Sequence, residues 1–156
     1  MRSTPQCPDV RRGGSVAMAI LGVFFAACAV TLVSPYDEST DRAVTALQAT
    51  VDSFLITLAH DLQAPACTYE KSKHFYTHTL TGVSSLEVRN RARPKNEITV
   101  EQVVISDSSL VLLERLHKGK GDSVCMSAAE VEPLRRNFNT IFTAILTLEF
   151  AKKRGS

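Results

Sequence analysis

Residues 127–155 read SAAEVEPLRRNFNTIFTAILTLEFAKKRG, and this stretch decides the fold class. Its apolar stripe consists of Val131, Leu134, Phe138, Ile141, Ile145 and Leu148. These residues recur at alternating spacings of three and four, which places them on one face of an α-helix. Ser127 and Glu130 form a capping box ahead of the stripe, and a basic last turn precedes Gly155. The stretch therefore predicts a long amphipathic helix.

Two earlier segments show the same periodicity. The first covers about residues 37–62, with a stripe of Val44, Leu47, Val51, Phe54, Leu58 and Leu62. The second covers about residues 67–91, with a stripe of Tyr69, Ser72, Tyr76, Leu80 and Val83. The second helix should end before Pro94, because the residue before a proline is pushed out of the helical region. Gly82 costs this helix up to about 1 kcal/mol relative to alanine.

The segment from about residue 99 to residue 118 supports two interpretations. Its β-branched start, from Ile98 to Ile105, could form a strand. Against that, Thr99 and Gln102 make a capping-box pattern, and a leucine-rich stretch continues to Gly119. We therefore prefer a helix here as well.

Four amphipathic helices joined by short breaks predict an all-α fold. Short connections make helices that follow one another in the chain antiparallel. We expect an up-down-up-down four-helix bundle over residues 35–156.

The N-terminal part of the chain carries the feature that determines its class. Residues 16–33 form an 18-residue apolar run without a charge, which is just long enough to span a bilayer. Arg2, Arg11 and Arg12 precede it, so the positive-inside rule keeps residues 1–15 in the cytoplasm and sends the later residues across. We expect the helical domain to face the periplasm from a bacterial inner or outer membrane.

Three fates of the apolar run remain open. It can stay as a single-pass transmembrane anchor, or it can be cleaved as a signal peptide, since small residues follow a 12-residue apolar region. It can also be a lipoprotein signal, because Phe25-Ala26-Ala27-Cys28 approximates the usual pattern before a lipidated cysteine. Cys28 is thus the lipidation candidate.

The charge balance argues against nucleic acid as a partner. The formal net charge is +2, and without Asp9 and the three N-terminal arginines the chain carries 15 basic (18 − 3) and 15 acidic (16 − 1) residues. Binding a phosphate backbone requires a positive surface, which this composition does not supply.

The histidines give little indication of catalysis or metal binding. His74 and His78 are four residues apart, as a chelating pair on a helix would be, but they lie opposite the apolar stripe and should face solvent. His60 and His117 close two helices, where a protonated ring suits the helix dipole. Glycine-rich phosphate loops, nucleophile elbows and zinc-protease motifs do not occur in the sequence. We expect neither an enzyme nor a cofactor.

Two cysteines of the helical domain should form a disulfide. Cys67 and Cys125 each precede a helix, and those two helices run parallel in the expected bundle. Their thiols therefore meet at one end, away from the membrane, in a compartment where disulfides persist.

Basic residues gather at the other end of the expected bundle. They are Arg89, Arg91, Arg93, Lys95, Lys152, Lys153 and Arg154. They either attract anionic headgroups or complement two helix C-termini, and the second role is the better supported by pattern alone.

Two functions from different classes fit these observations. The first is a non-enzymatic envelope module that binds another envelope protein or the membrane surface, with the N-terminal segment as its membrane contact. The second is a bundle that holds a small ligand or a metal in its core.

Overall fold

The computed structural model describes residues 33–60, 66–121 and 124–155. These residues form four α-helices and no strand, which confirms the all-helical expectation. The helices are α2 (Glu38–His60), α3 (Tyr69–Arg91), α4 (Glu97–Gly119) and α5 (Ala128–Arg154). The strand interpretation of residues 98–105 is wrong, because this segment lies inside α4.

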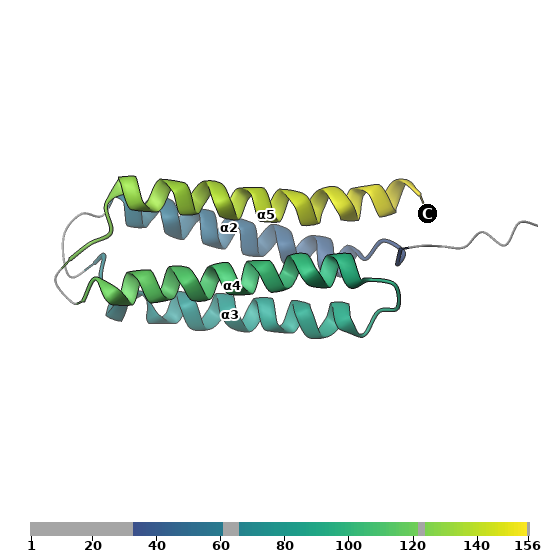
Figure 1. The fold of residues 1–156 in the computed structure, drawn as a ribbon, viewed down its shortest axis with the longest axis horizontal. Helices are drawn as coiled ribbons and strands as arrows, with labels where there is room; N and C mark the ends of the chain where they lie inside the picture. The colour runs from purple at the N-terminus through teal and green to yellow at the C-terminus, as the bar shows by residue number, and fades with distance from the viewer. Residues whose placement is uncertain (1–32, 61–65, 122–123, 156) are drawn as a thin grey trace, which may run out of the picture. The chain divides into compact units, whose positions relative to one another are not determined.

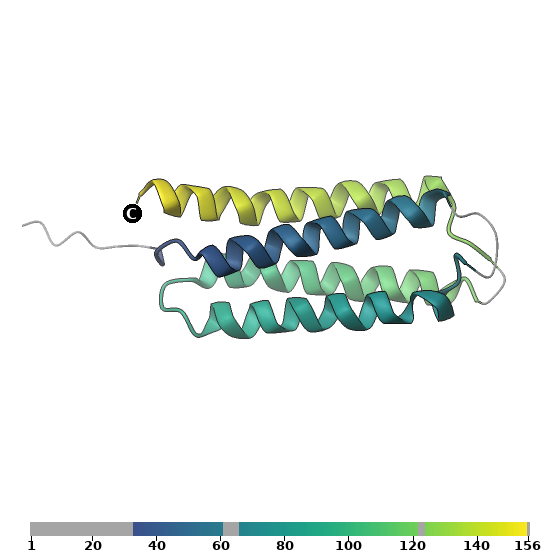
Figure 2. The same ribbon diagram turned by 180° about the vertical axis from the view of Figure 1, so that it is seen from behind.

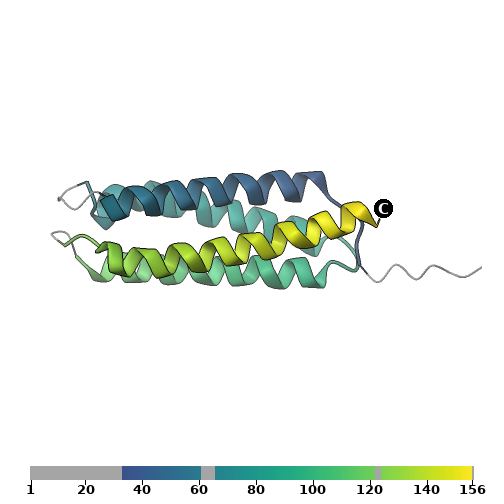
Figure 3. The ribbon, with the colours of Figure 1, turned by 90° about the horizontal axis from the view of Figure 1, so that it is seen from above.

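The helices alternate in direction and pack as a four-helix bundle (Figure 1). Each helix packs against its neighbours in the chain, and α5 closes the ring against α2. Helices α2 and α4 are therefore diagonal, as are α3 and α5. The views from behind and from above show the same order (Figures 2 and 3).

We call the two ends of the bundle proximal and distal. The proximal end holds residue 33, the start of α2, the α3–α4 turn and the end of α5 (Figure 1). The distal end holds the end of α2 and the starts of α3 and α5. The apolar run at residues 16–33 lies, except for Val33, outside the described residues, and none of the described helices meets the length and hydropathy needed to span a membrane.

The core contains most of the stripes expected from the sequence, with Leu55 and Phe142 buried in addition, while Phe54, Leu80, Leu134 and Ile141 are only partly buried. Buried members from all four helices include Val44, Val51, Leu55, Tyr76, Val83, Leu110, Leu113, Phe138, Phe142 and Ile145. Gly82 belongs to this packing, because a Cβ added there would lie 3.1 Å from Cδ2 of Leu47. Gly82 lowers the stability of α3 as a helix, but its missing side chain lets α2 and α3 approach closely at Leu47.

Side-chain capping fixes the starts of α2 and α5. Asp37 caps α2 by accepting a hydrogen bond from the backbone N–H of Thr40 at 3.2 Å. The capping box before α5 is confirmed, since the backbone N–H of Ser127 donates to the Glu130 carboxylate at 2.9 Å. In the α3–α4 turn, Lys95 adopts a left-handed conformation with a φ of 60°.

The capping box expected at Thr99 and Gln102 is wrong. Helix α4 begins two residues earlier, so Thr99 lies inside its first turn and is fully buried. Its hydroxyl contacts buried groups of α5 instead of a backbone N–H. The capping pattern failed because interhelical partners took this side chain.

Candidate functional site

The outward face of α4 carries an apolar stripe on the surface. Ile98, Ile105, Leu112 and Leu116 are 51%, 52%, 47% and 45% exposed. The first three are spaced by seven residues and Leu116 follows one turn later, so at about 100° per residue all four share one side of the helix. We call these four residues the α4 stripe.

Exposed apolar residues concentrate on this helix. Ten large hydrophobic side chains are exposed in the part of the chain that the structure describes, and five of them belong to α4, Val111 being the fifth. Single exposed apolar residues are ordinary, but contiguous patches mark interaction sites. The α4 stripe is therefore the surface best suited to contact a partner.

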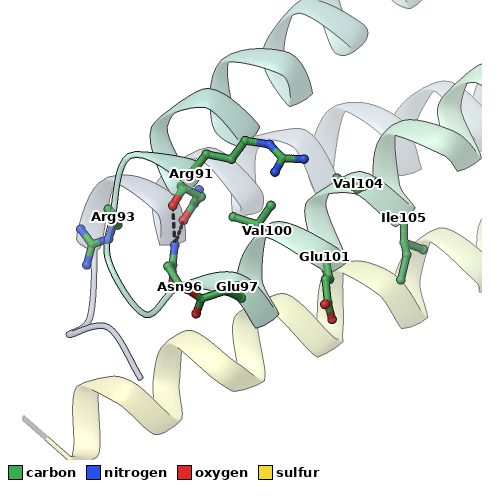
Figure 4. Close-up of a pocket in the computed structure, with 9 residues that line it drawn as sticks. Arg91, Arg93, Asn96, Glu97, Val100, Glu101, Val104 and Ile105 are labelled. Carbon is green, nitrogen blue, oxygen red and sulfur yellow. Dashed lines mark hydrogen bonds between the residues drawn. The ribbon is translucent and has the colours of Figure 1, made fainter. Parts of the chain in front are cut away.

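A groove runs beside the stripe, between the end of α3 and the first half of α4 (Figure 4). It encloses about 720 Å³. Val100, Val104 and Ile105 supply its apolar lining, and Arg91 enters from the α3 side (Figure 4). Ile105 belongs to both features, so the groove extends the apolar surface toward α3.

Charges flank the stripe without being neutralised locally. Glu101 also lines the groove, and Arg115 lies near the other end of α4. Neither makes an ion pair or hydrogen bond within the described residues, whereas Arg91 pairs with Glu87 at 2.7 Å. Glu101 and Arg115 thus remain able to pair with charges from outside the bundle.

This face was not predicted from the sequence. The leucine-rich end of α4 was predicted to be helical, but its exposed leucines were not separated from its buried ones. The buried face holds Thr99, Val103, Ser106, Leu110, Leu113 and His117. Leu112 and Leu116 fall outside that 3–4 spacing, and this is the signal that could have separated them.

A buried polar network centred on Lys152 lies at the proximal end of the bundle. Its Nζ donates hydrogen bonds to Oε1 of Glu149 at 2.6 Å, to Oδ1 of Asn96 at 2.8 Å and to Oγ1 of Thr99 at 2.8 Å. The side chains of Lys152 and Glu149 are only 3% and 1% exposed. A charge pair this deeply buried holds only when its remaining polar atoms are also satisfied.

The same network fixes the segment that precedes α2. The hydroxyl of Ser34 donates to Asn96 at 2.6 Å, and the backbone N–H of Asp37 donates to Glu149 at 3.3 Å. The Lys95 carbonyl accepts a hydrogen bond from the backbone N–H of Ser34 at 2.8 Å. The chain therefore joins the bundle through a fixed contact from Ser34 onward.

The seven basic residues expected at one end belong to the last turn of α3, the α3–α4 turn and the last turn of α5, which all lie at the proximal end. Lys152 is buried there and cannot contribute to a surface patch. The others are partly neutralised. Arg89 and Arg93 pair with Asp37 at 3.1 and 3.4 Å, and Lys153 lies 5.1 Å from the centroid of the Tyr36 ring. Attraction of anionic headgroups to the remaining basic residues stays a prediction, and these internal pairs reduce the charge available for it. The residues are Arg89, Arg91, Arg93, Lys95, Lys153 and Arg154.

His117 was expected to close its helix as a protonated ring, and the structure contradicts this expectation. The residue is fully buried at the distal end. Its Nε2 lies 2.8 Å from the Cys67 carbonyl, which can only accept, so Nε2 carries the proton and Nδ1 accepts from the Tyr76 hydroxyl at 2.8 Å. Burial lowers the pKa of His117 below its ordinary value, against an opposing contribution from the Cys67 carbonyl.

This burial predicts a loss of stability in mild acid. The lowered pKa of folded His117 means that the unfolded chain binds more protons below about pH 6.5. Stability should therefore be complete above that pH and fall as the pH drops toward the folded-state pKa. Urea unfolding at about pH 7.5 and pH 5 should show this loss in the wild type and a smaller loss in His117→Gln. The exposed His60→Gln serves as the matched control, and an equal loss in all three proteins would contradict the assignment.

Cys67 and Cys125 meet at the distal end as expected. The structure joins them in a disulfide with a Cα–Cα distance of 5.3 Å, well inside the range that a disulfide allows. The bond links the loops before the diagonal helices α3 and α5, so it connects the two halves of the bundle.

His74 and His78 face solvent as expected, with parallel rings whose centroids are 6.1 Å apart. Within the described segments, no group of three potential metal-ligating side chains forms. Cys28 lies outside the described residues.

Comparison of the chain with protein-family models, with curated proteins and with solved structures finds no match.

Proposed function

We propose that this protein is a non-enzymatic helical module of the bacterial cell envelope that binds a protein partner through the outward face of α4. The concentration of exposed apolar side chains on α4 is the observation that carries this proposal. The adjoining groove, with its apolar lining and charged rim, supports it, because protein interfaces combine an apolar centre with a polar margin.

The envelope location is supported by two independent features. Residues 16–33 have the composition of a membrane-targeting segment with arginines before it. The disulfide at the distal end suits a compartment outside the cytoplasm, where such bonds persist. We propose that residues 35–156 face the periplasm.

The mode of attachment has three candidates, of which lipidation at Cys28 is one. Membrane fractionation of the wild type and of Cys28→Ser separates them. A wild type in the soluble fraction would indicate a cleaved signal peptide. For a membrane-bound wild type, release or stalled processing of Cys28→Ser would support a lipoprotein, and unchanged membrane association would favour a retained anchor.

The binding role predicts that one substitution on α4 removes the protein from its complex. Ile105→Glu places a charge at the centre of the stripe without touching the core, because the side chain is half exposed. In mild detergent extracts of the native envelope, the wild type should migrate in a larger assembly that Ile105→Glu loses.

The matched control for this experiment is Val88→Glu on α3. Val88 is the most exposed large hydrophobic side chain of the described residues, at 69%, and it lies off the stripe. The assembly should survive this substitution. If both variants behave like the wild type, α4 is not the binding face.

A further inference from the structure

We infer that the partner of the α4 face is a second copy of this chain, docked antiparallel through a two-fold axis beside Ser108. This inference rests on the proposed function, since it names the occupant of the same face. A two-fold interface requires a surface that is complementary to itself, so the residues of α4 must match when the helix is reversed.

The apolar residues of the stripe meet this requirement. Ile105 lies three residues before Ser108 and Leu112 lies four after it, while Ile98 and Leu116 lie ten before and eight after. Reversing α4 about Ser108 therefore brings Ile105 near the partner's Leu112. It also brings Ile98 within one helical turn of the partner's Leu116.

The flanking charges set the direction. Glu101 and Arg115 lie seven residues before and seven after Ser108. They are about 40° apart around the helix, so both lie on the same flank of the stripe. A two-fold axis perpendicular to the two helices keeps each flank on its own side, and Glu101 then faces the partner's Arg115 twice in the dimer.

Parallel pairing would leave these charges without partners. A two-fold axis along the helices places Glu101 and its copy at the same height but on opposite flanks of the interface, and Arg115 likewise, so no glutamate meets an arginine. Both side chains lack an ion-pair partner in the described part of their own chain. Antiparallel pairing supplies each with the opposite charge.

The size of the stripe indicates a weak, concentration-dependent dimer. From Ile98 to Leu116 the helix rises about 27 Å, at 1.5 Å per residue. A contact one helix wide over this length falls below the standard interface of about 800 Å² per partner. Antiparallel pairing also places the two Val33 residues at opposite ends of the dimer, so two chains anchored in one membrane would pair with their bundles lying along its surface.

Charge reversal with rescue tests the arrangement. In Glu101→Arg every chain carries two arginines at the paired positions, and in Arg115→Glu it carries two glutamates. Each variant alone should be monomeric in native mass spectrometry of the full chain in detergent. An equal mixture should form a dimer that contains one copy of each, because every arginine then faces a glutamate. Lys71→Glu, on the exposed surface of α3, changes the charge equally and should dimerise like the wild type.

Three outcomes would overturn the inference: a monomeric wild type, dimers of either variant alone, or no dimer in the mixture. Dimers that persist in each variant alone would indicate parallel pairing or another face. A monomeric wild type together with a native assembly that depends on Ile105 would reject the second copy and leave the proposed function standing.

Discussion

Lys152→Met should lower the free energy of unfolding by about 3–5 kcal/mol. Within the described residues, Lys152 is the only cation that pairs with Glu149. The Glu149 carboxylate is almost fully buried. Among the described residues, removing the lysine leaves the Glu149 carboxylate with only the Thr99 hydroxyl and the Asp37 N–H as hydrogen-bond donors, each at 3.3 Å. The loss should appear as a lower midpoint of urea unfolding at neutral pH.

Two variants make this result specific. The double substitution Glu149→Gln and Lys152→Met should cost clearly less than Lys152→Met alone, because it leaves no uncompensated charge. Lys153→Met, at the neighbouring exposed position, should change stability by no more than about 0.5 kcal/mol. Equal losses at Lys152 and Lys153 would show that the buried pair contributes nothing special.

Cys67→Ala with Cys125→Ala should cost about 4 kcal/mol. The bond closes a loop between residues 58 positions apart, and the chain-entropy model gives about this value for a loop of that size. Urea unfolding of the double variant should show the loss, and a reductant should destabilise the wild type but leave the variant unchanged.

The thiol state in cells completes this test. Alkylation before lysis should leave Cys67 and Cys125 unmodified if the domain lies outside the cytoplasm. Full modification of both in native cells would contradict the disulfide and the proposed location together. A reductant without effect on stability would contradict the entropic role alone.

The helices and their order could be predicted from the sequence because apolar periodicity reports local geometry. Val44, Val51 and Leu58 recur on one face of α2, and the structure buries all three. The short connections then fixed the alternation of directions. The disulfide followed from this topology, since the starts of α3 and α5 share one end.

The polar interior could not be predicted in the same way. Lys152 and His117 were expected to act as cations at helix ends. Each nevertheless continues the 3–4 spacing of a buried stripe: Lys152 follows Ile145 and Glu149, and His117 follows Leu110 and Leu113. A polar residue at such a position is buried only when other helices bring it partners. Asn96, Glu149 and Tyr76 supply those partners from distant parts of the chain, and local pattern does not show this.

Photo-crosslinking in living cells tests the role of the α4 face most directly. A photoreactive phenylalanine at Leu112 would sit on the stripe, and the same residue at Val88 would sit on the exposed surface of α3. The proposed function predicts a discrete crosslinked band from position 112 and none from position 88. A band at twice the mass of the chain would identify the second copy, and another mass would identify a different protein partner. No band from position 112, or the same band from both positions, would contradict binding through α4.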